Sequence, residues 1–327
     1  MTSSENSAPR AVQLGLRFVN ALDEAQLDER TERLRELVND DATWWIDTGR
    51  DRVAGQRGHD PGDERPWPLH GTMPMSEKLE FVKRIAPEIF PQGLGRRIVS
   101  RSFGNDDVAL IEAEGNGMHA SGKAYRNRYA FVIDVAGDRI QSVREYLDTL
   151  HADDVFGSER ASKRTTAPMP TAASAAAART DNEKLVMSLW PALAASDIDA
   201  FGACFHADAS WWTDSGTDRD RGDFDTHGGT ANGYPLHGVI TITEKLDYMR
   251  SRLHSGYSGA SVDVTPIRLF SDGDFVALEA ESFAKLSNER VYQNRYVFVV
   301  EMQGSRIKQV REYCDTLHVI DVTTGRD

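Results

Sequence analysis

The first forty residues place apolar side chains three and four positions apart, the spacing of one face of an α-helix. The apolar positions are Val12, Leu16, Val19 and Leu22, followed by Leu34 and Leu37. Residues 181–206 repeat this spacing. The pattern therefore predicts two helices over residues 10–40 and two more over residues 181–206.

Further along, β-branched and aromatic residues dominate, and the pattern predicts strands. The predicted strands are Thr43–Asp47, 107–114, 123–135 and 139–149. A hairpin turn is expected at Gly137-Asp138. Between the first and second strands, the segment MSEKLEFVKRIA predicts a third helix with Ser76 as its N-cap. Helices that precede a run of hairpin-forming strands indicate the α+β class.

The same pattern occurs twice. Residues 125–151 read YRNRYAFVIDVAGDRIQSVREYLDTLH, and residues 292–318 read YQNRYVFVVEMQGSRIKQVREYCDTLH. DATWWIDTGRDR likewise has a counterpart in DASWWTDSGTDR, at the same offset of 167 positions. A period this long is a duplicated domain rather than a solenoid repeat. We therefore predict domains at 11–156 and 181–322, joined by a flexible Ala-, Ser-, Thr- and Pro-rich linker at 157–180.

Composition, charge and missing motifs argue against several classes of function. The 327-residue chain carries a formal net charge of −13, which argues against nucleic-acid and anionic-membrane partners. Its cysteines, Cys204 and Cys314, form neither a disulfide framework nor a zinc motif. A signal peptide and a membrane-spanning run are both missing, so we expect a cytoplasmic protein. Phosphate-cradling and dinucleotide-binding motifs are absent too, and we expect no cofactor and no metal.

The last strand of each copy offers a candidate catalytic group. Alternation places Val143, Glu145 and Leu147 on one face, and Glu312 has the same place in the second copy. Burial among apolar neighbours disfavours a charged carboxylate, so the pKa of each glutamate is expected to rise toward neutrality. Such a group can move protons near pH 7. The alternative is that these glutamates pair with neighbouring arginines and only hold the sheet together.

A WWxD motif supplies a second carboxylate in each copy. Asp47 and Asp214 end a predicted strand beside Trp45 and Trp212. They are candidate catalytic bases at the mouth of an apolar pocket, with the tryptophans as substrate-binding residues. Equally, each aspartate could be a turn residue that caps the loop that follows.

An aromatic face with one amide suits a pocket wall, because rings supply apolar area and the amide can hydrogen-bond a carbonyl or a water. The residues on this predicted substrate-binding face are Tyr125, Asn127 and Tyr129, and Tyr292, Asn294 and Tyr296. The same stripe could instead be core, with its amide satisfied by the backbone.

Other polar residues are weaker candidates. Further possible site residues are His70 and His237 before the third helix, and Asp148 and Asp315, which are expected to cap the end of the last strand. Glutamates also occur two positions apart on the predicted strand 107–114 and on its counterpart in the second copy, and this spacing favours a solvated strand face. They are Glu112, Glu114, Glu279 and Glu281.

The order of helices, WWxD strand, third helix and YxNRY…GxRI…VREYxDTxH hairpin resembles the SnoaL-like, ketosteroid-isomerase-like branch of the nuclear transport factor 2-like superfamily. The resemblance covers residues 11–155 and 180–322. It implies two tandem cone-shaped domains, each with about three helices packed on a strongly curved, mostly antiparallel sheet around a pocket. Such domains commonly dimerise through their sheets, which implies an intramolecular pseudo-dimer of the two copies or a homo-oligomer.

The resemblance also suggests roles for residues of this chain. Asp47 falls near the aspartate that is the base of ketosteroid isomerases. Asn127 falls near their protonated aspartate, so an amide replaces the acidic donor. Phe18 and Trp190 replace the helix-one tyrosine. Glu145 falls where SnoaL-like cyclases and limonene-type epoxide hydrolases have a functional aspartate, although the arginine–aspartate pair of those hydrolases has no clear match here.

The sequence thus predicts a cofactor-independent acid–base enzyme of the isomerase, dehydratase or lyase, or cyclase type. Its substrate would be a small, largely apolar molecule that bears a carbonyl or hydroxyl group. The alternatives are a non-catalytic small-molecule-binding or assembly module and an epoxide hydrolase of the limonene type. The loops at 49–67 and 216–234 diverge most between the copies, which predicts lids with different ligand preferences.

Overall fold

The structure is a computed structural model. It describes residues 8–23, 27–46, 71–93, 95–156, 177–213, 238–255, 262–286 and 290–324. The chain forms two compact units. The first contains the described residues up to Ile46 and from Thr72 to Glu145, and the second contains those from Tyr146 onward.

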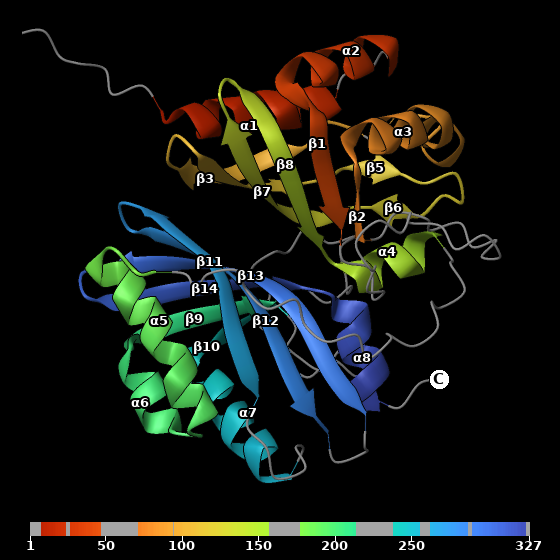
Figure 1. The fold of residues 1–327 in the computed structure, drawn as a ribbon. Helices are drawn as coiled ribbons and strands as arrows, with labels where there is room; N and C mark the ends of the chain where they lie inside the picture. Colours follow the sequence, from red (N-terminus) through yellow and green to blue (C-terminus); the bar gives the residue numbers. More distant parts are fainter. Residues whose placement is uncertain are drawn as a thin grey trace, which may run out of the picture. The chain divides into compact units, whose positions relative to one another are not determined.

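Two helices open the first copy and a run of strands follows α3, as predicted, but a helix that was not predicted, α4, comes after the last strand (Figure 1). Its elements are α1 (Arg10–Leu22), α2 (Leu27–Leu37), β1 (Val38–Ile46), β2 (Gly71–Pro74), α3 (Met75–Ile89), β3 (Ile98–Gly104), β4 (Val108–Glu114), β5 (Gly117–Met118), β6 (Ala124–Tyr125), β7 (Arg128–Ala136), β8 (Arg139–Leu147) and α4 (Thr149–Phe156). The sheet order is β2-β1-β8-β7-β4-β3. Strands β1 and β8 run parallel, whereas β4 is antiparallel to both of its neighbours.

The second copy repeats this arrangement. Its elements are α5 (Asp181–Ala194), α6 (Ile198–Ala203), β9 (Phe205–Thr213), β10 (Gly238–Thr241), α7 (Ile242–Ser255), β11 (Asp263–Asp272), β12 (Phe275–Lys285), β13 (Val291–Gln303), β14 (Arg306–Cys314) and α8 (Thr316–Thr324). The sheet order, β10-β9-β14-β13-β12-β11, matches the first copy strand for strand. The predicted α+β class and the tandem duplication are therefore confirmed.

Several predicted boundaries were wrong. β1 begins at Val38 rather than Thr43, and β3 was not predicted at all. The third helix is confirmed, but Pro74 precedes it and Ser76 lies inside its first turn, where it makes no cap. The domain boundaries stay predictions, because residues 157–176 lie outside the described residues.

Helix α1 packs closely on its sheet because a glycine lets the backbones approach. A Cβ on Gly15 would lie 3.1 Å from Cγ1 of Ile111 on β4 and 3.2 Å from Cδ1 of Ile133 on β7. Phe18, on the next turn of the helix, is fully buried and its ring centroid lies 5.4 Å from that of Trp44 on β1. The helix therefore covers the face of the sheet toward which Trp44 points.

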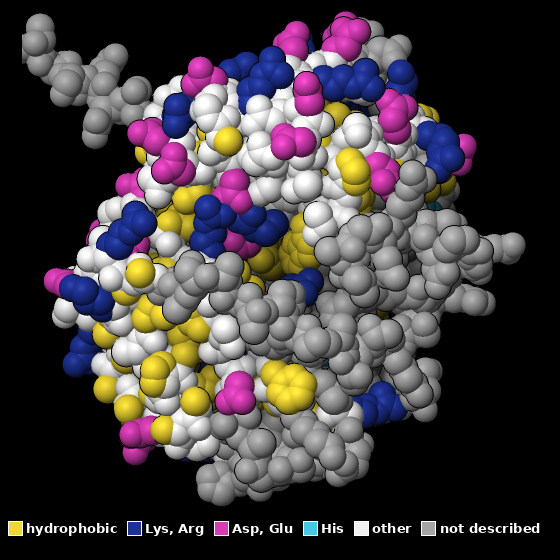
Figure 2. All heavy atoms as spheres, in the orientation of Figure 1, with side chains coloured by type: hydrophobic (Ala, Val, Ile, Leu, Met, Phe, Trp, Pro, Cys, Tyr) yellow, Lys and Arg dark blue, Asp and Glu magenta, His cyan; other side chains and the backbone are white. Residues whose placement is uncertain are grey.

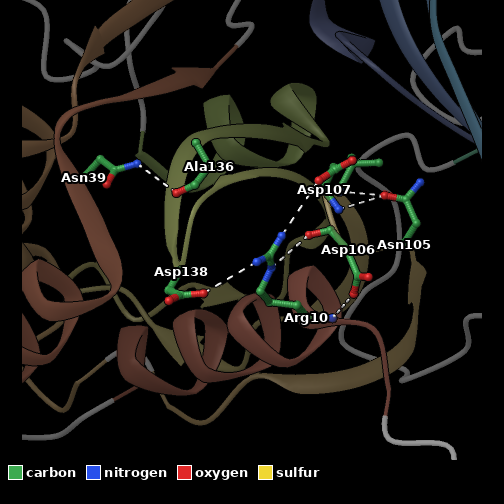
Figure 3. Close-up of polar contacts among 8 residues, drawn as sticks. Arg10, Asn39, Asn105, Asp106, Asp107, Ala136 and Asp138 are labelled. Carbon is green, nitrogen blue, oxygen red and sulfur yellow. Dashed lines mark hydrogen bonds and ion pairs between the residues drawn. The ribbon is translucent and has the colours of Figure 1, made fainter.

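Polar contacts hold the N-terminus of α1 in place (Figure 3). The backbone N–H of Arg10 donates to Asp106 Oδ1 at 2.9 Å. The Arg10 guanidinium lies 3.9 Å from Asp107 and 3.5 Å from Asp138, in the turns after β3 and β7. Exposed pairs of this kind contribute little free energy. They orient the helix end relative to two hairpins, whereas buried apolar contacts supply the stability.

Candidate functional site

The predicted orientation of the glutamates is confirmed. Val143, Glu145 and Leu147 on β8 are 0%, 8% and 3% exposed. The side chain of Glu312 on β14 is 12% exposed, and its strand neighbour Val310 belongs to the core of the second copy. Both carboxylates therefore lie on the core-facing side of their sheets.

Glu145 is held by donors from two other elements. Nε1 of Trp44 on β1 donates to Glu145 Oε2 at 2.8 Å, and Nζ of Lys78 on α3 lies 3.4 Å from the same oxygen. The Lys78 ammonium also sits 4.5 Å from the Trp44 ring centroid, a cation–π arrangement. Burial lowers the pKa of Lys78, and the nearby Glu145 opposes that shift.

The second copy builds the same cluster. Trp211 Nε1 donates to Glu312 Oε2 at 2.6 Å, and Lys245 Nζ lies 3.3 Å from that oxygen and 4.2 Å from the Trp211 ring centroid. Thr213 Oγ1 adds a donor at 3.2 Å. Its counterpart in the first copy is Ile46, which cannot donate. The tryptophan–lysine–glutamate cluster is therefore common to both copies, and the hydroxyl is specific to the second.

The donors leave one oxygen of each carboxylate available. Every hydrogen bond that Glu145 or Glu312 accepts from a described residue ends on Oε2. Among the described residues, Oε1 of either glutamate has no donor. The arrangement can therefore fix the carboxylate through Oε2 while Oε1 accepts a proton.

The prediction chose the other tryptophan of each pair. Along the strand, Trp44 lies next to Val143 of β8 and Trp45 lies next to Arg144, so the two rings point to opposite faces. Trp212 stands on the outer face of its sheet, with its ring centroid 5.1 Å from that of Tyr313. Trp45 and Trp212 therefore do not face the glutamates.

The predicted aromatic face lies beside the cluster. Tyr125, Tyr129 and Tyr296 are buried, and the hydroxyls of Tyr292 and Tyr296 are hydrogen-bonded to each other. Burial raises the pKa of Tyr125, Tyr292 and Tyr296 well above the usual value. These phenols therefore stay protonated near neutral pH and can act as hydrogen-bond donors.

Asn294 is occupied by the backbone. Its Nδ2 donates to the Asp315 carbonyl at 3.1 Å, and its Oδ1 accepts from the Asp315 N–H at 3.2 Å. This favours the alternative in which the amide is a core residue that ties β13 to the start of α8. Asn127 in the first copy is fully buried, and its Nδ2 lies 3.4 Å from the Tyr125 hydroxyl.

Asp148 and Asp315 cap helices rather than strands. Asp148 Oδ1 accepts from the N–H groups of Leu150 and His151 at the start of α4. Within the second unit, Thr149 Oγ1 also donates to Asp315 at 2.5 Å, and Thr316 donates to Asp148. These two aspartates therefore join α4 to α8 and are already saturated with donors.

The remaining predicted site residues cannot be placed. Asp47, Asp214, His70 and His237 lie outside the described residues, as do the predicted lids at 49–67 and 216–234. Their roles stay predictions.

The expected solvated face on β4 and β12 was wrong. Glu112, Glu279 and Glu281 are 0%, 2% and 5% exposed. They are buried because each has a partner. The Arg101 guanidinium lies 3.4 Å from Glu112, the Tyr146 hydroxyl donates to Glu279 at 2.7 Å, and the Arg295 guanidinium donates to Glu281 at 2.6 Å.

Comparisons with known proteins give structural neighbours only. Neither a protein-family model nor a curated protein matches the sequence. An NTF2-like protein of unknown function from Burkholderia pseudomallei is 16% identical over 45% of this chain and 99% of its own, with a TM-score of 0.36. A Catenulispora acidiphila protein with a ketosteroid isomerase-like fold is 14% identical over 44% and 94%, with a TM-score of 0.33.

A putative SnoaL-like polyketide cyclase from Jannaschia is 14% identical over 49% of this chain and 100% of its own, with a TM-score of 0.35. Each of these neighbours is therefore about half the length of this chain. These neighbours are described as NTF2-like, ketosteroid isomerase-like and SnoaL-like proteins, each matching about half of this chain, whose own two halves repeat one strand order.

Proposed function

We propose that each copy is a cofactor-independent acid–base site in which Glu145 or Glu312 takes a proton from a small, largely apolar molecule that bears a carbonyl or hydroxyl group. One observation carries the proposal. Each copy holds a buried glutamate through a tryptophan N–H and a lysine on a single oxygen, and no described residue donates to the other oxygen. A fixed acceptor in a water-poor place is what general-base catalysis requires.

The neighbouring side chains supply the rest of the chemistry. When a proton leaves the carbon beside a carbonyl, negative charge develops on the carbonyl oxygen. Protonated phenols such as Tyr125 and Tyr296 can donate to that oxygen. The proton then returns from the glutamate that took it. The product is an isomer, an eliminated alkene or a closed ring.

A non-catalytic binding module is the second candidate. It is favoured by the ion pairs themselves, because Lys78 and Lys245 give each carboxylate a permanent partner. Such a pair can be purely structural, and a fold of this kind does not fix a function. No observation on the described residues specifically favours a limonene-type epoxide hydrolase, and the experiment below includes an assay for that activity.

The test measures hydrogen–deuterium exchange at the α-carbons of 2-tetralone in D₂O by NMR. We expect the full chain to exchange these positions faster than buffer, and the double variant Glu145→Gln, Glu312→Gln to return to the buffer rate. The matched control is Glu114→Gln, Glu281→Gln, a pair with the same spacing of 167 positions that lies on β4 and β12, on the opposite face of each sheet.

Three other outcomes separate the alternatives. Saturable binding of 2-tetralone with exchange at the buffer rate favours the binding module. Conversion of styrene oxide to its diol without ketone exchange favours the hydrolase. Exchange that survives in the double variant removes both glutamates from the mechanism.

A further inference from the structure

The two copies differ at interior positions around the shared cluster. Where the first copy has Arg97, Gly115 and Leu147, the second has Val264, Ser282 and Cys314. The strand registers support this correspondence, because Arg101 lies beside Glu112 as Arg268 lies beside Glu279. The change from Arg97 to Val264 is the largest, since it removes a cation.

Arg97 is buried and anchored on one side. Its backbone N–H donates to Asp23 Oδ2 at 2.6 Å, and its Nη1 donates to Asp23 Oδ1. The Arg97 side chain is 10% exposed, and that of Asp23 is 7% exposed. The guanidinium carbon lies 5.5 Å from the ring centroid of Tyr129. Asp23 thus fixes the direction in which the guanidinium points.

One donor of this guanidinium meets no acceptor within the part of the chain that the structure describes. Nε of Arg97 is buried, and it has no acceptor among the described residues. Burial would lower the pKa of Arg97, but the nearby Tyr129, Asp23 and Glu145 raise it, so the group stays charged. A buried, charged N–H without an acceptor is costly and uncommon. It is explained if a ligand supplies the missing acceptor.

The second copy satisfies its tyrosine without a charge. Ser282 Oγ lies 3.2 Å from the Tyr296 hydroxyl. The first copy has Gly115 there, where a Cβ would already lie 3.3 Å from the Tyr129 ring. Val264, in the place of Arg97, packs against the apolar core. Glu145 is ion-paired with Lys78, and its charge raises the pKa of Arg97, whereas Lys245 is the cation on Glu312 among the described residues.

We propose that the first copy binds a small molecule that carries a carboxylate, with the carboxylate on Arg97 Nε, and that the second copy binds an uncharged molecule. The proposal rests on the proposed function for the location of the site and deepens it by assigning a ligand class to each copy. Arg97 is then the residue that sets the specificity.

Size-matched acid and amide pairs test this by calorimetric titration of the full chain. The pairs are formate with formamide, benzoate with benzamide, and 2-naphthoate with 2-naphthamide. A charge-assisted hydrogen bond from Arg97 should give one site per chain that prefers the carboxylate about 10- to 100-fold over its amide. The double variant Asp23→Ala, Arg97→Val should lose this preference while it still binds the amides.

Removing both partners avoids a buried unpaired Asp23, which could unfold a single Arg97 variant. Arg97→Lys should retain part of the preference, and Arg96→Val, which removes the same charge from an exposed neighbour, should retain all of it. The proposal is overturned if no carboxylate saturates the chain below about 10 mM, or if the preference survives in the double variant. Exchange of 2-tetralone reports on the glutamates separately, so either idea can fail alone.

Discussion

Lys78 and Glu145 are both about nine-tenths buried, with side chains 8% and 10% exposed. Removing one member of such a pair leaves a charge with neither water nor a partner. We therefore expect Lys78→Met to lower the free energy of unfolding by about 3–5 kcal/mol. Adding Glu145→Gln should recover most of that loss, because no uncompensated charge remains. Denaturant unfolding of the variants measures both effects.

Lys245→Met and Glu312→Gln form the matched pair in the second copy. There Thr213 donates a further hydrogen bond to the carboxylate, so the stability lost with Lys245→Met should be smaller. If Lys245→Met alone and Lys245→Met with Glu312→Gln lower the free energy of unfolding equally, the buried unpaired charge of the glutamate does not determine the stability of the cluster.

The buried phenols make a pH prediction. The pKa values of Tyr125, Tyr292 and Tyr296 are raised by burial in the folded state, whereas an unfolded chain ionises near pH 10. Their contribution to stability is present below that pH and is lost as the pH rises above it. Tyrosinate absorbance should therefore show these three of the nine tyrosines ionising only as the protein unfolds. Titration of all nine near pH 10 in the native state would contradict this.

At the scale of elements, α4 and α8 depend on reciprocal hydrogen bonds. Thr149 Oγ1 accepts from the Leu317 N–H and donates to Asp315, and Thr316 Oγ1 accepts from the Leu150 N–H and donates to Asp148. Thr149→Val or Thr316→Val removes these contacts from a buried place. Each variant should cost about 1–3 kcal/mol of stability.

The double variant tests whether the two threonines act as one unit. Because each hydroxyl serves both helices, the losses should not add, and the interaction free energy should be about 0.5 kcal/mol or more. Strict additivity in denaturant unfolding would mean that the two contacts are independent. Thr180→Ala, at the capping box of α5, provides a helix cap outside this network as a control.

The elements that sequence periodicity predicted are those whose stability comes from a long apolar face. α1 and α3 were of this kind, whereas α4 has eight residues and depends on Asp148 and on α8. β3 escaped because its side chains are largely half-exposed or exposed, with no continuous apolar face. The turn at Gly137, with φ of +63°, was predictable because that backbone favours glycine.

Part of the candidate site was predictable from the sequence: the orientation of Glu145 was, but its contact with Lys78 was not. Alternation along one strand fixed the face of Glu145, since its period of two needs no knowledge of the neighbours. Lys78 was missed because a lysine in a helix is ordinarily solvated, and only packing of α3 against β1 shows otherwise. The signal was present in the segment EKL, at 77–79 and again at 244–246.

At the scale of the whole chain, the two tryptophan–lysine–glutamate clusters share no residue. Trp44, Lys78 and Glu145 come from the first copy alone, and Trp211 and Lys245 meet Glu312 in the second. Charge does not single out one surface in the view of Figure 2, where basic and acidic side chains are interspersed around α1 and α2. The duplication therefore supplies two such clusters, each built within one half of the chain.

Separate sites should contribute separately to turnover. Glu145→Gln alone should remove the first copy's share of 2-tetralone exchange and leave the second copy's share, and Glu312→Gln should do the reverse. Because the two clusters share no residue, the two losses should sum to the loss in the double variant. The exchange rate of each variant, measured at equal folded concentration, gives this comparison. If one substitution alone abolishes all exchange, the losses do not add, and the expectation of two independently active copies is wrong.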